Sequence, residues 1–286
     1  MEIPTYEQVI ANKQLSPIQM MKEILKLDKY SKCPTDLKGS FAGNNILYHF
    51  QFEQLCRTNR NGKVSFYDMM SNNESRETLW NKMIQYNPNG KHNPARLYEM
   101  YRFLHGAIVL FKPSVAINLY TRYKATAVLD PCAGWGGRML GAIALGIPYT
   151  GIDTNTDLKP GYDALMAQIP SHSTMIYGSA MDQDFSTIDY DFVLTSPPYC
   201  NLELYAHMPL WEGPTEFYEE FLIPLIDRCR KHVRRDGKVC FNISPSMYAE
   251  LIRRKYPPAI EEIPMLQQVR KSKVKHDLCY VWNRLE

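Results

Sequence analysis

Several features that would place this chain outside the cytoplasm are missing from its sequence. It has no run of about eighteen apolar residues and no charged-then-apolar leader after Met1. Its seven cysteines are scattered without a C-x-x-C pair, and its seven histidines show no H-x-x-x-H spacing. We therefore expect no membrane span, no disulfide framework, no metal site and a cytoplasmic location.

The basic residues of the chain are clustered, although its formal net charge is only +3. Its 286 residues, 45% of them hydrophobic, suffice for one large domain or two small ones. Between Arg228 and Lys275 there are thirteen Lys or Arg against four Asp or Glu, which favours a phosphate-facing surface, with a solvated face as the alternative. The residues predicted to contact nucleic acid are Arg253, Arg254, Lys255, Arg270, Lys271, Lys273 and Lys275.

From about residue 95 onward, short apolar or β-branched runs alternate with helix-compatible segments. The runs are "TAVLD" (126–130), "YTGID" (149–153), "TMIY" (174–177), "DFVLT" (191–195) and "KVCFNI" (238–243). Such runs are typical of parallel strands that are buried on both faces. The pattern predicts a doubly wound α/β domain with a mostly parallel sheet over residues 96–286.

The predicted helices differ between the two parts of the chain. Residues 1–95 contain one helical stretch (16–30) and turn-rich polar pieces, which predicts a small accessory module and a candidate for nucleic-acid recognition. Residues 95–123 predict two helices with a break near Pro113. A further helix is predicted from an N-cap at Thr215 to Gly237, and the basic residues near its end also suit the helix dipole.

A Gly-rich turn follows the first predicted strand in "VLDPCAGWGGRMLGAIALG" (128–146). Ligands of open α/β sheets bind beyond the carboxyl ends of the strands, where glycine lets the backbone approach them closely. Asp153 ends the next strand, where a carboxylate can accept both hydroxyls of a ribose. The dinucleotide fingerprint starting at Gly134 would need glycine where Met139 stands, so a pyrophosphate is not favoured. Asp130 is better suited to a cationic amine.

Two motifs together resemble the amino-methyltransferases that modify exocyclic amines of bases in DNA. Those enzymes share a D-P-x-x-G-x-G cofactor loop and an (S/D/N)-P-P-(Y/F) catalytic loop, and this chain has "DPCAGWG" at 130–136 and "SPPY" at 196–199. The resemblance covers roughly residues 108–286 and implies a Rossmann-like class I fold that uses S-adenosylmethionine. The cofactor-binding residues that it implies are Phe111, Lys112, Pro113, Asp130, Pro131, Cys132, Ala133, Gly134, Gly136, Asp153 and Asp182.

The same resemblance implies a role for several of these residues. It puts the segment 111–113 near the methionine carboxylate and the 130–136 loop against the methionine portion. It also puts Asp153 at the ribose and Asp182 near the adenine amine, with Asp184 as a rival for that last role.

The "SPPY" stretch explains how a poorly nucleophilic aromatic amine could be activated. Proline fixes φ, has no N–H and makes the preceding residue extended, so the loop is stiff and rich in acceptors. The Ser196 hydroxyl and the Pro197 carbonyl can accept the two amine hydrogens, and Tyr199 can stack on a base flipped out of the duplex. The predicted catalytic residues are Ser196, Pro197, Pro198 and Tyr199.

The target is the part of the function that the sequence restricts least. The serine form of the loop is commoner in enzymes that act on cytosine, so N4 of cytosine is slightly favoured over N6 of adenine in a site-specific enzyme of the restriction–modification kind. An RNA base, a protein glutamine amide and a non-catalytic nucleic-acid-binding role on this fold are the alternatives. Because neither gap between the motifs can hold a large recognition region, recognition is assigned to residues 1–95 and the basic C-terminal stretch.

Overall fold

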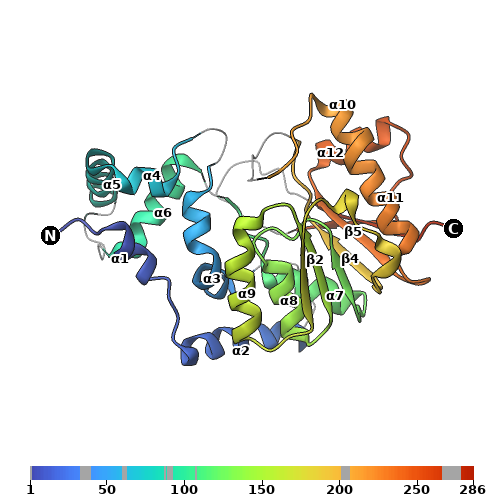
Figure 1. Cartoon of the computed structure of the whole chain (residues 1–286), viewed down its shortest axis with the longest axis horizontal. Helices are drawn as coiled ribbons and strands as arrows, with labels where there is room; N and C mark the ends of the chain where they lie inside the picture. The colour runs from blue at the N-terminus through green and yellow to red at the C-terminus, as the bar shows by residue number, and fades with distance from the viewer. Residues whose placement is uncertain are drawn as a thin grey trace.

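The computed structural model describes residues 2–32, 40–59, 63–86, 88, 93–106, 108–200, 207–265 and 278–286. Within these residues, a group of helices is followed by a seven-stranded sheet with its own helices (Figure 1). The helices of the first group are α1 (Tyr6–Ala11), α2 (Pro17–Lys32), α3 (Asn44–Arg57), α4 (Phe66–Ser71), α5 (Asn73–Tyr86) and α6 (Pro94–His105).

The sheet has the order β3-β2-β1-β4-β5-β7-β6. Its strands are β1 (Val128–Asp130), β2 (Tyr149–Asp153), β3 (Ser173–Tyr177), β4 (Phe192–Thr195), β5 (Lys238–Ile243), β6 (Glu261–Pro264) and β7 (Leu278–Asn283). Strands β1 to β5 are parallel, whereas β7 is antiparallel to both β5 and β6. The prediction of a doubly wound, mostly parallel sheet is therefore confirmed, and the five predicted runs coincide with β1 to β5.

Strands β6 and β7 were not predicted from the sequence. β6 reads "EEIP", which has two acids and a proline and therefore no strand pattern of its own. It becomes a strand by pairing with β7, which in turn pairs with β5 along its whole length. Tertiary pairing thus decides this edge of the sheet.

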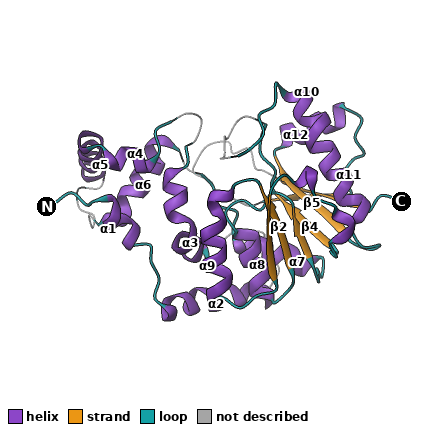
Figure 2. Cartoon of the chain, in the orientation of Figure 1, coloured by secondary structure: helices purple, strands orange, loops and turns teal. Residues whose placement is uncertain are grey.

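Both faces of the sheet are covered by helices (Figure 2). Strand residues point alternately to the two faces. Val128 and Phe192 share an apolar core with α7 (Pro113–Arg122), α8 (Gly137–Leu145) and α9 (Lys159–Gln168). Leu129 and Val193 pack on the other side with α11 (Ile223–His232) and α12 (Pro245–Arg253).

The helix predicted from Thr215 to Gly237 differs in both of its ends. The short α10 (Pro214–Glu216) begins it, because proline's fixed φ suits the first helical position. A π-helical segment, η4 (Phe217–Leu222), leads into α11, which ends before the extended Val233. Gly237 instead belongs to the turn that enters β5, with its amide donating to the Arg234 carbonyl at 2.9 Å.

The first group of helices packs directly on the sheet domain. α2 contacts α7 and α8, and α3 contacts α9. α6 begins at Pro94 and packs against α1 and α5, so this helical region runs past residue 95. The sequence underestimated its helix content, because its short helices are stabilised by shared tertiary contacts more than by long periodic patterns. The division of the chain at residue 95 stays a prediction.

Candidate active site

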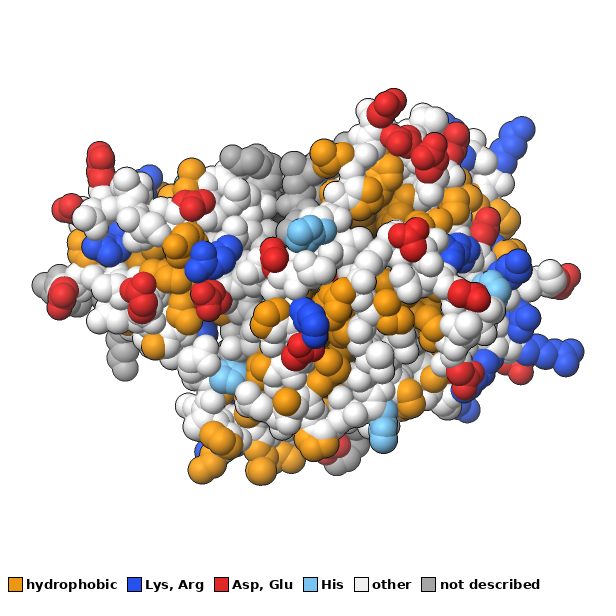
Figure 3. Space-filling view, viewed as in Figure 1, with side chains coloured by type: hydrophobic (Ala, Val, Ile, Leu, Met, Phe, Trp, Pro, Cys, Tyr) orange, Lys and Arg blue, Asp and Glu red, His pale blue; other side chains and the backbone are white. Residues whose placement is uncertain are grey.

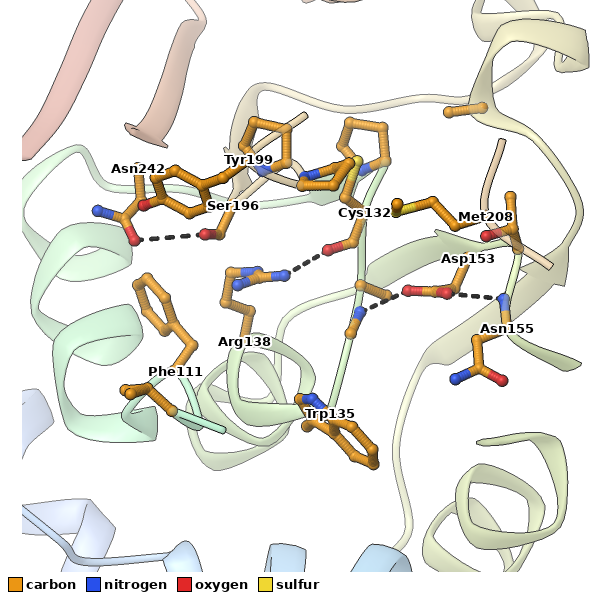
Figure 4. Close-up of a pocket in the computed structure, with 18 of the residues that line it drawn as sticks. Phe111, Cys132, Trp135, Arg138, Asp153, Asn155, Ser196, Tyr199, Met208 and Asn242 are labelled. Atoms are coloured by element: carbon orange, nitrogen blue, oxygen red, sulfur yellow. Dashed lines mark hydrogen bonds between the residues drawn. The ribbon is translucent and has the colours of Figure 1, made fainter. Parts of the chain in front are cut away.

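A cavity of about 1310 Å³ lies at the carboxyl ends of β1, β2 and β4. Pockets that hold one drug-sized ligand measure about 300–1,000 Å³, so this one has room for two ligands side by side. Figure 4 shows Ser196, Tyr199 and Asn242 on one side of it and Asp153 with Asn155 on the other. The two motifs singled out in the sequence therefore line one cavity.

The Gly-rich loop between β1 and α8 lines the floor of the cavity with residues 131–135. Gly134 and Gly136 have φ of 57° and 86°, a left-handed conformation that glycine adopts without steric cost. The loop is held from two sides. The Cys132 amide donates to Thr195 Oγ1 at 3.1 Å, and the Tyr162 hydroxyl donates to the Gly134 carbonyl at 2.8 Å.

Asp153 ends β2 with its carboxylate held by two backbone amides. The Gly134 amide donates to Oδ2 at 2.6 Å, and the Asn155 amide donates to Oδ1 at 2.8 Å. Burial raises the pKa of Asp153 to about 6, although these two hydrogen bonds act to lower it. The side chain lines the cavity and couples the β1 loop to the β2 loop.

The "SPPY" loop leaves the end of β4 and lines the cavity with all four of its residues. The Ser196 hydroxyl faces the side chain of Asn242 on β5, with 3.4 Å between Oγ and Oδ1. Asn242 Nδ2 donates to the Leu278 carbonyl at 3.2 Å, so its Oδ1 is left facing the loop. At Cys200, directly after Tyr199, φ is 48°, which turns the chain away from the strand direction.

Comparison with known proteins gives structural matches only. No family model matches the sequence, and no curated protein matches it. TrmN from Thermus thermophilus is 18% identical and covers 61% of this chain and 49% of its own length, with a TM-score of 0.47. Precorrin-6y C5,15-methyltransferase from Geobacter metallireducens is 13% identical and covers 61% and 90%, with a TM-score of 0.43. This chain thus spans about half the length of TrmN.

The arrangement of the strands identifies the fold. Five parallel strands are followed by β7, which inserts between β5 and β6 and runs antiparallel to both. This is the fold of class I S-adenosylmethionine-dependent methyltransferases. A fold does not specify its substrate, so the methyl acceptor has to be argued from the site itself.

Asp130 lies elsewhere than the sequence predicts for this methyltransferase fold. Its side chain is fully buried and does not line the cavity. Arg138 Nε donates to its Oδ2 at 2.6 Å, and the Tyr149 hydroxyl donates to the same oxygen at 2.6 Å. Arg138 also donates to the Cys132 carbonyl, so Asp130 supports the loop through this arginine. The predicted direct contact of Asp130 with a ligand amine does not fit this arrangement.

Other predicted cofactor residues divide into two groups. Phe111 and Lys112 line the cavity, whereas Pro113 is buried as the first residue of α7 and Gly136 lies behind the loop as the N-cap of α8. Asp182 is exposed and outside the cavity, because the η2 turn (Ala180–Asp182) carries it away. Lining residues that the sequence did not reveal on that side are Asn155, Leu158, Gly178, Ser179 and Ala180.

An aromatic cluster on the far side of the cavity also escaped the sequence analysis. The rings of Trp211 and Phe217 are 4.9 Å apart, and those of Trp211 and Phe221 are 5.1 Å apart. All three side chains are buried and line the cavity beyond the "SPPY" loop. Phe217 and Phe221 belong to the π-helical segment, a feature that is frequent at functional sites and has no sequence signature.

The basic cluster 253–255 is only partly available to a ligand. Arg254 Nε donates to Glu250 Oε1 at 3.0 Å, and its Nη1 donates to Glu219 Oε1 at 2.6 Å. Its guanidinium forms ion pairs within the fold, and its contact with a phosphate stays a prediction. Arg253 is exposed at the end of α12, about 9 Å along the helix from Met247 in the cavity wall, and its Nη1 pairs with Glu250 Oε2 at 2.6 Å. Lys255 is exposed just after the helix.

Two further arginines of the basic C-terminal half, near the end of α11, bond within the fold. Arg230 is buried and donates to the Asn283 carbonyl and the Tyr256 hydroxyl, while Arg234 pairs with Asp189. On the face shown in Figure 3, basic and acidic side chains are interspersed. The remaining predicted contacts, Arg270, Lys271, Lys273 and Lys275, lie outside the described residues.

Metal-ligating clusters and membrane-spanning helices are both missing from the described part of the chain. No group of three or more His, Cys, Asp or Glu is placed there to hold a metal ion. None of the helices there has the length and apolar character needed to cross a bilayer.

Proposed function

We propose that this protein transfers a methyl group from S-adenosylmethionine to the exocyclic amine of a base in DNA, with N4 of cytosine favoured over N6 of adenine. One observation carries the proposal: Ser196, Pro197 and Tyr199 line the same cavity as Asp153 and the Gly-rich loop. A cofactor held on the Asp153 side would have its reactive methyl group, the group this cofactor supplies, next to an acceptor held by the "SPPY" loop.

The residues on the Asp153 side fit S-adenosylmethionine. Asp153 would accept from the ribose hydroxyls with the carboxylate faces that its two amide donors leave open. Gly134 leaves space in front of it, because an added Cβ would meet no other atom closer than 3.9 Å. The Lys112 ammonium, in the cavity wall, would attract the methionine carboxylate.

The residues on the other side fit a planar amine. Ser196 Oγ and the Pro197 carbonyl would accept its two hydrogens and leave the nitrogen lone pair directed toward the methyl carbon. Asn242 Oδ1 would accept the hydrogen bond that the Ser196 hydroxyl donates, which leaves the serine lone pairs free to accept from the amine. Tyr199 would stack on the ring. The transfer would release S-adenosylhomocysteine as a neutral thioether, and the methylated nitrogen would then lose its extra proton to solvent water.

The direct test is methylation of defined substrates. The purified protein is incubated with S-adenosylmethionine and unmethylated genomic DNA, and the digested nucleosides are identified by mass spectrometry. We expect N4-methylcytosine or N6-methyladenine. Parallel reactions with total RNA and with protein extract separate the alternatives, and a methyl group on a ring carbon, a ribose or a protein side chain alone would reject the DNA amine proposal.

Acidification should weaken cofactor binding around pH 6. Because the pKa of Asp153 is raised to about 6, the side chain takes up a proton as the pH falls through this value and loses acceptor strength. Affinity for S-adenosylhomocysteine, measured by calorimetry, should fall about tenfold for each pH unit below 6. Asp153→Asn should bind more weakly than the wild type at pH 7 and lack this step. Equal wild-type affinity at pH 5 and pH 7 would contradict the assignment.

Removing four basic residues should flatten the salt dependence of DNA binding. We expect the combined replacement of Arg270, Lys271, Lys273 and Lys275 by alanine to weaken binding to DNA of any sequence. The slope of log affinity against log salt should drop by roughly one for each phosphate group that the variant no longer neutralises. Fluorescence anisotropy between low and moderate salt measures it, and an unchanged slope would make this cluster a solvated surface.

A further inference from the structure

Helix α3, from the first group of helices, contacts the loop that carries the Asp153 side of the cavity. α3 lies beside α9 in Figure 1. Gln51 on α3 is only 4% exposed, and its Nε2 donates to the Leu158 carbonyl at 3.1 Å. Leu158 ends the η1 turn (Thr156–Leu158) and lines the cavity together with Asp153 and Asn155. A buried hydrogen bond thus joins the helix to this wall.

Helices α3 and α9 pack in close contact beside this hydrogen bond. Gly161, in the first turn of α9, faces the backbone of α3. A Cβ at this position would lie 2.5 Å from the Phe50 carbonyl oxygen and even closer to the side-chain oxygen Oε1 of Gln51. Only glycine permits this approach, so α3 and the start of α9 have one close-fitting arrangement.

The same helical region contacts the two other loops of the cofactor side. The Ser40 amide donates to Ser114 Oγ at 3.0 Å, and that hydroxyl donates back to the Ser40 carbonyl at 3.2 Å. Ser114 is the second residue of α7, which follows the segment of Phe111 and Lys112. Leu47 on α3 comes within 3.6 Å of the position that a Cβ on Gly137 would take, at the end of the Gly-rich loop. Residues 40–51 therefore lie against the η1 turn and against the first residues of α7 and α8, which directly follow the two other loops of the cofactor side.

We infer that α3 stabilises the conformation of the cofactor-binding loops and that Gln51 is a positioning residue for cofactor binding. The inference rests on the proposed function for the identity of the ligand. It gives the first group of helices a role in the cofactor site in addition to the recognition role expected from the sequence. Because the loops and α3 share these contacts, a ligand that orders the loops also stabilises the docking of α3, and the coupling is reciprocal.

Calorimetry with S-adenosylhomocysteine tests the role of Gln51. Gln51→Leu removes the donor to the Leu158 carbonyl and keeps most of the side-chain volume. Residues along such a connection change coupling by factors of about two to thirty, and we expect a loss of affinity in this range. Glu53→Gln is the matched control, since Glu53 lies on the exposed face of α3, where it pairs with Arg57, and it should bind as the wild type does.

A second variant separates positioning from a general loss of stability. Gln51→Glu places a carboxylate against the Leu158 carbonyl, where the ionised form repels and the protonated form can donate in place of the amide. The ratio of its dissociation constant to that of the wild type should therefore shrink as the pH falls from 8 to 5.5. The corresponding ratio for Gln51→Leu should stay constant over that range, because leucine does not titrate.

Hydrogen exchange provides a readout without substitution. S-adenosylhomocysteine should slow exchange of the α3 amides in the wild type, and much less so in Gln51→Leu. If the wild type binds the ligand without a change in α3 exchange, and Gln51→Leu binds it as tightly, the role of α3 and Gln51 would be overturned. The proposed function would still stand. If the wild-type protein does not bind this ligand, the proposed function would be overturned, and with it the role inferred for α3 and Gln51.

Discussion

Gly137→Ala is expected to destabilise the protein and abolish tight cofactor binding. An added Cβ would overlap the Phe111 carbonyl oxygen and lie 2.9 Å from its carbonyl carbon. Both atoms are backbone, so no side-chain rotation relieves the overlap, and the start of α8 must move away from the segment that carries Phe111 and Lys112. We expect a loss of about 3 kcal/mol in the free energy of unfolding, which corresponds to a fall in Tm of roughly 6–12 °C.

Differential scanning calorimetry and titration with S-adenosylhomocysteine check this expectation. Gly213→Ala is the matched control, because a Cβ there meets nothing within 4 Å and the backbone is extended, with φ of 179°. It should melt at the wild-type temperature. A Gly137→Ala protein with wild-type Tm and affinity would mean that the Phe111 segment can move without cost, contrary to the close approach described above.

Tyr199→Ala should cripple methyl transfer while cofactor binding stays nearly intact. Stacking of a base on an aromatic side chain contributes about 1–3 kcal/mol, so kcat/KM on duplex DNA should fall roughly ten- to a hundredfold. Tyr199→Phe should retain much of the activity, because the ring supplies the stacking. Steady-state kinetics with duplex DNA, alongside calorimetry with S-adenosylhomocysteine, separates the two effects.

Ser196→Ala probes the other half of the same loop. It should lower kcat more than it raises KM, because the hydrogen bond to the amine is proposed to strengthen as the nitrogen becomes pyramidal. Wild-type rates of amine methylation by Tyr199→Ala would refute the stacking mechanism.

Some of the agreement between sequence and structure has a local cause. The central strands β1, β4 and β5 are short, mostly apolar runs, because a strand buried on both faces is built mainly from such residues. The start of α7 at Pro113 follows from proline's missing N–H and fixed φ, which suit the first helical position. The left-handed φ of residues 134 and 136 explains why both are glycines. In parallel sheets the carboxyl ends of strands share one edge, which is why two distant motifs line one cavity.

Other features depend on partners that are distant in the chain. The sequence around Asp130 does not distinguish a carboxylate that contacts a ligand from one that, as here, accepts from Arg138 and Tyr149. Clustered arginines likewise predict a basic surface from sequence alone. In the structure, Arg230 and Arg254 form hydrogen bonds within the fold.

The sequence by itself determined the doubly wound sheet and the two loops that meet at its edge. The alternating apolar runs, the glycines and the prolines that predict them act through local backbone preferences. Only the tertiary structure decided that Asn242 faces Ser196, that Trp211 and the π-helical segment close the far wall, and that Gln51 supports the Asp153 side. These are contacts between segments up to 107 positions apart in the chain. Their energy depends on packing and burial, which no local pattern of residues encodes.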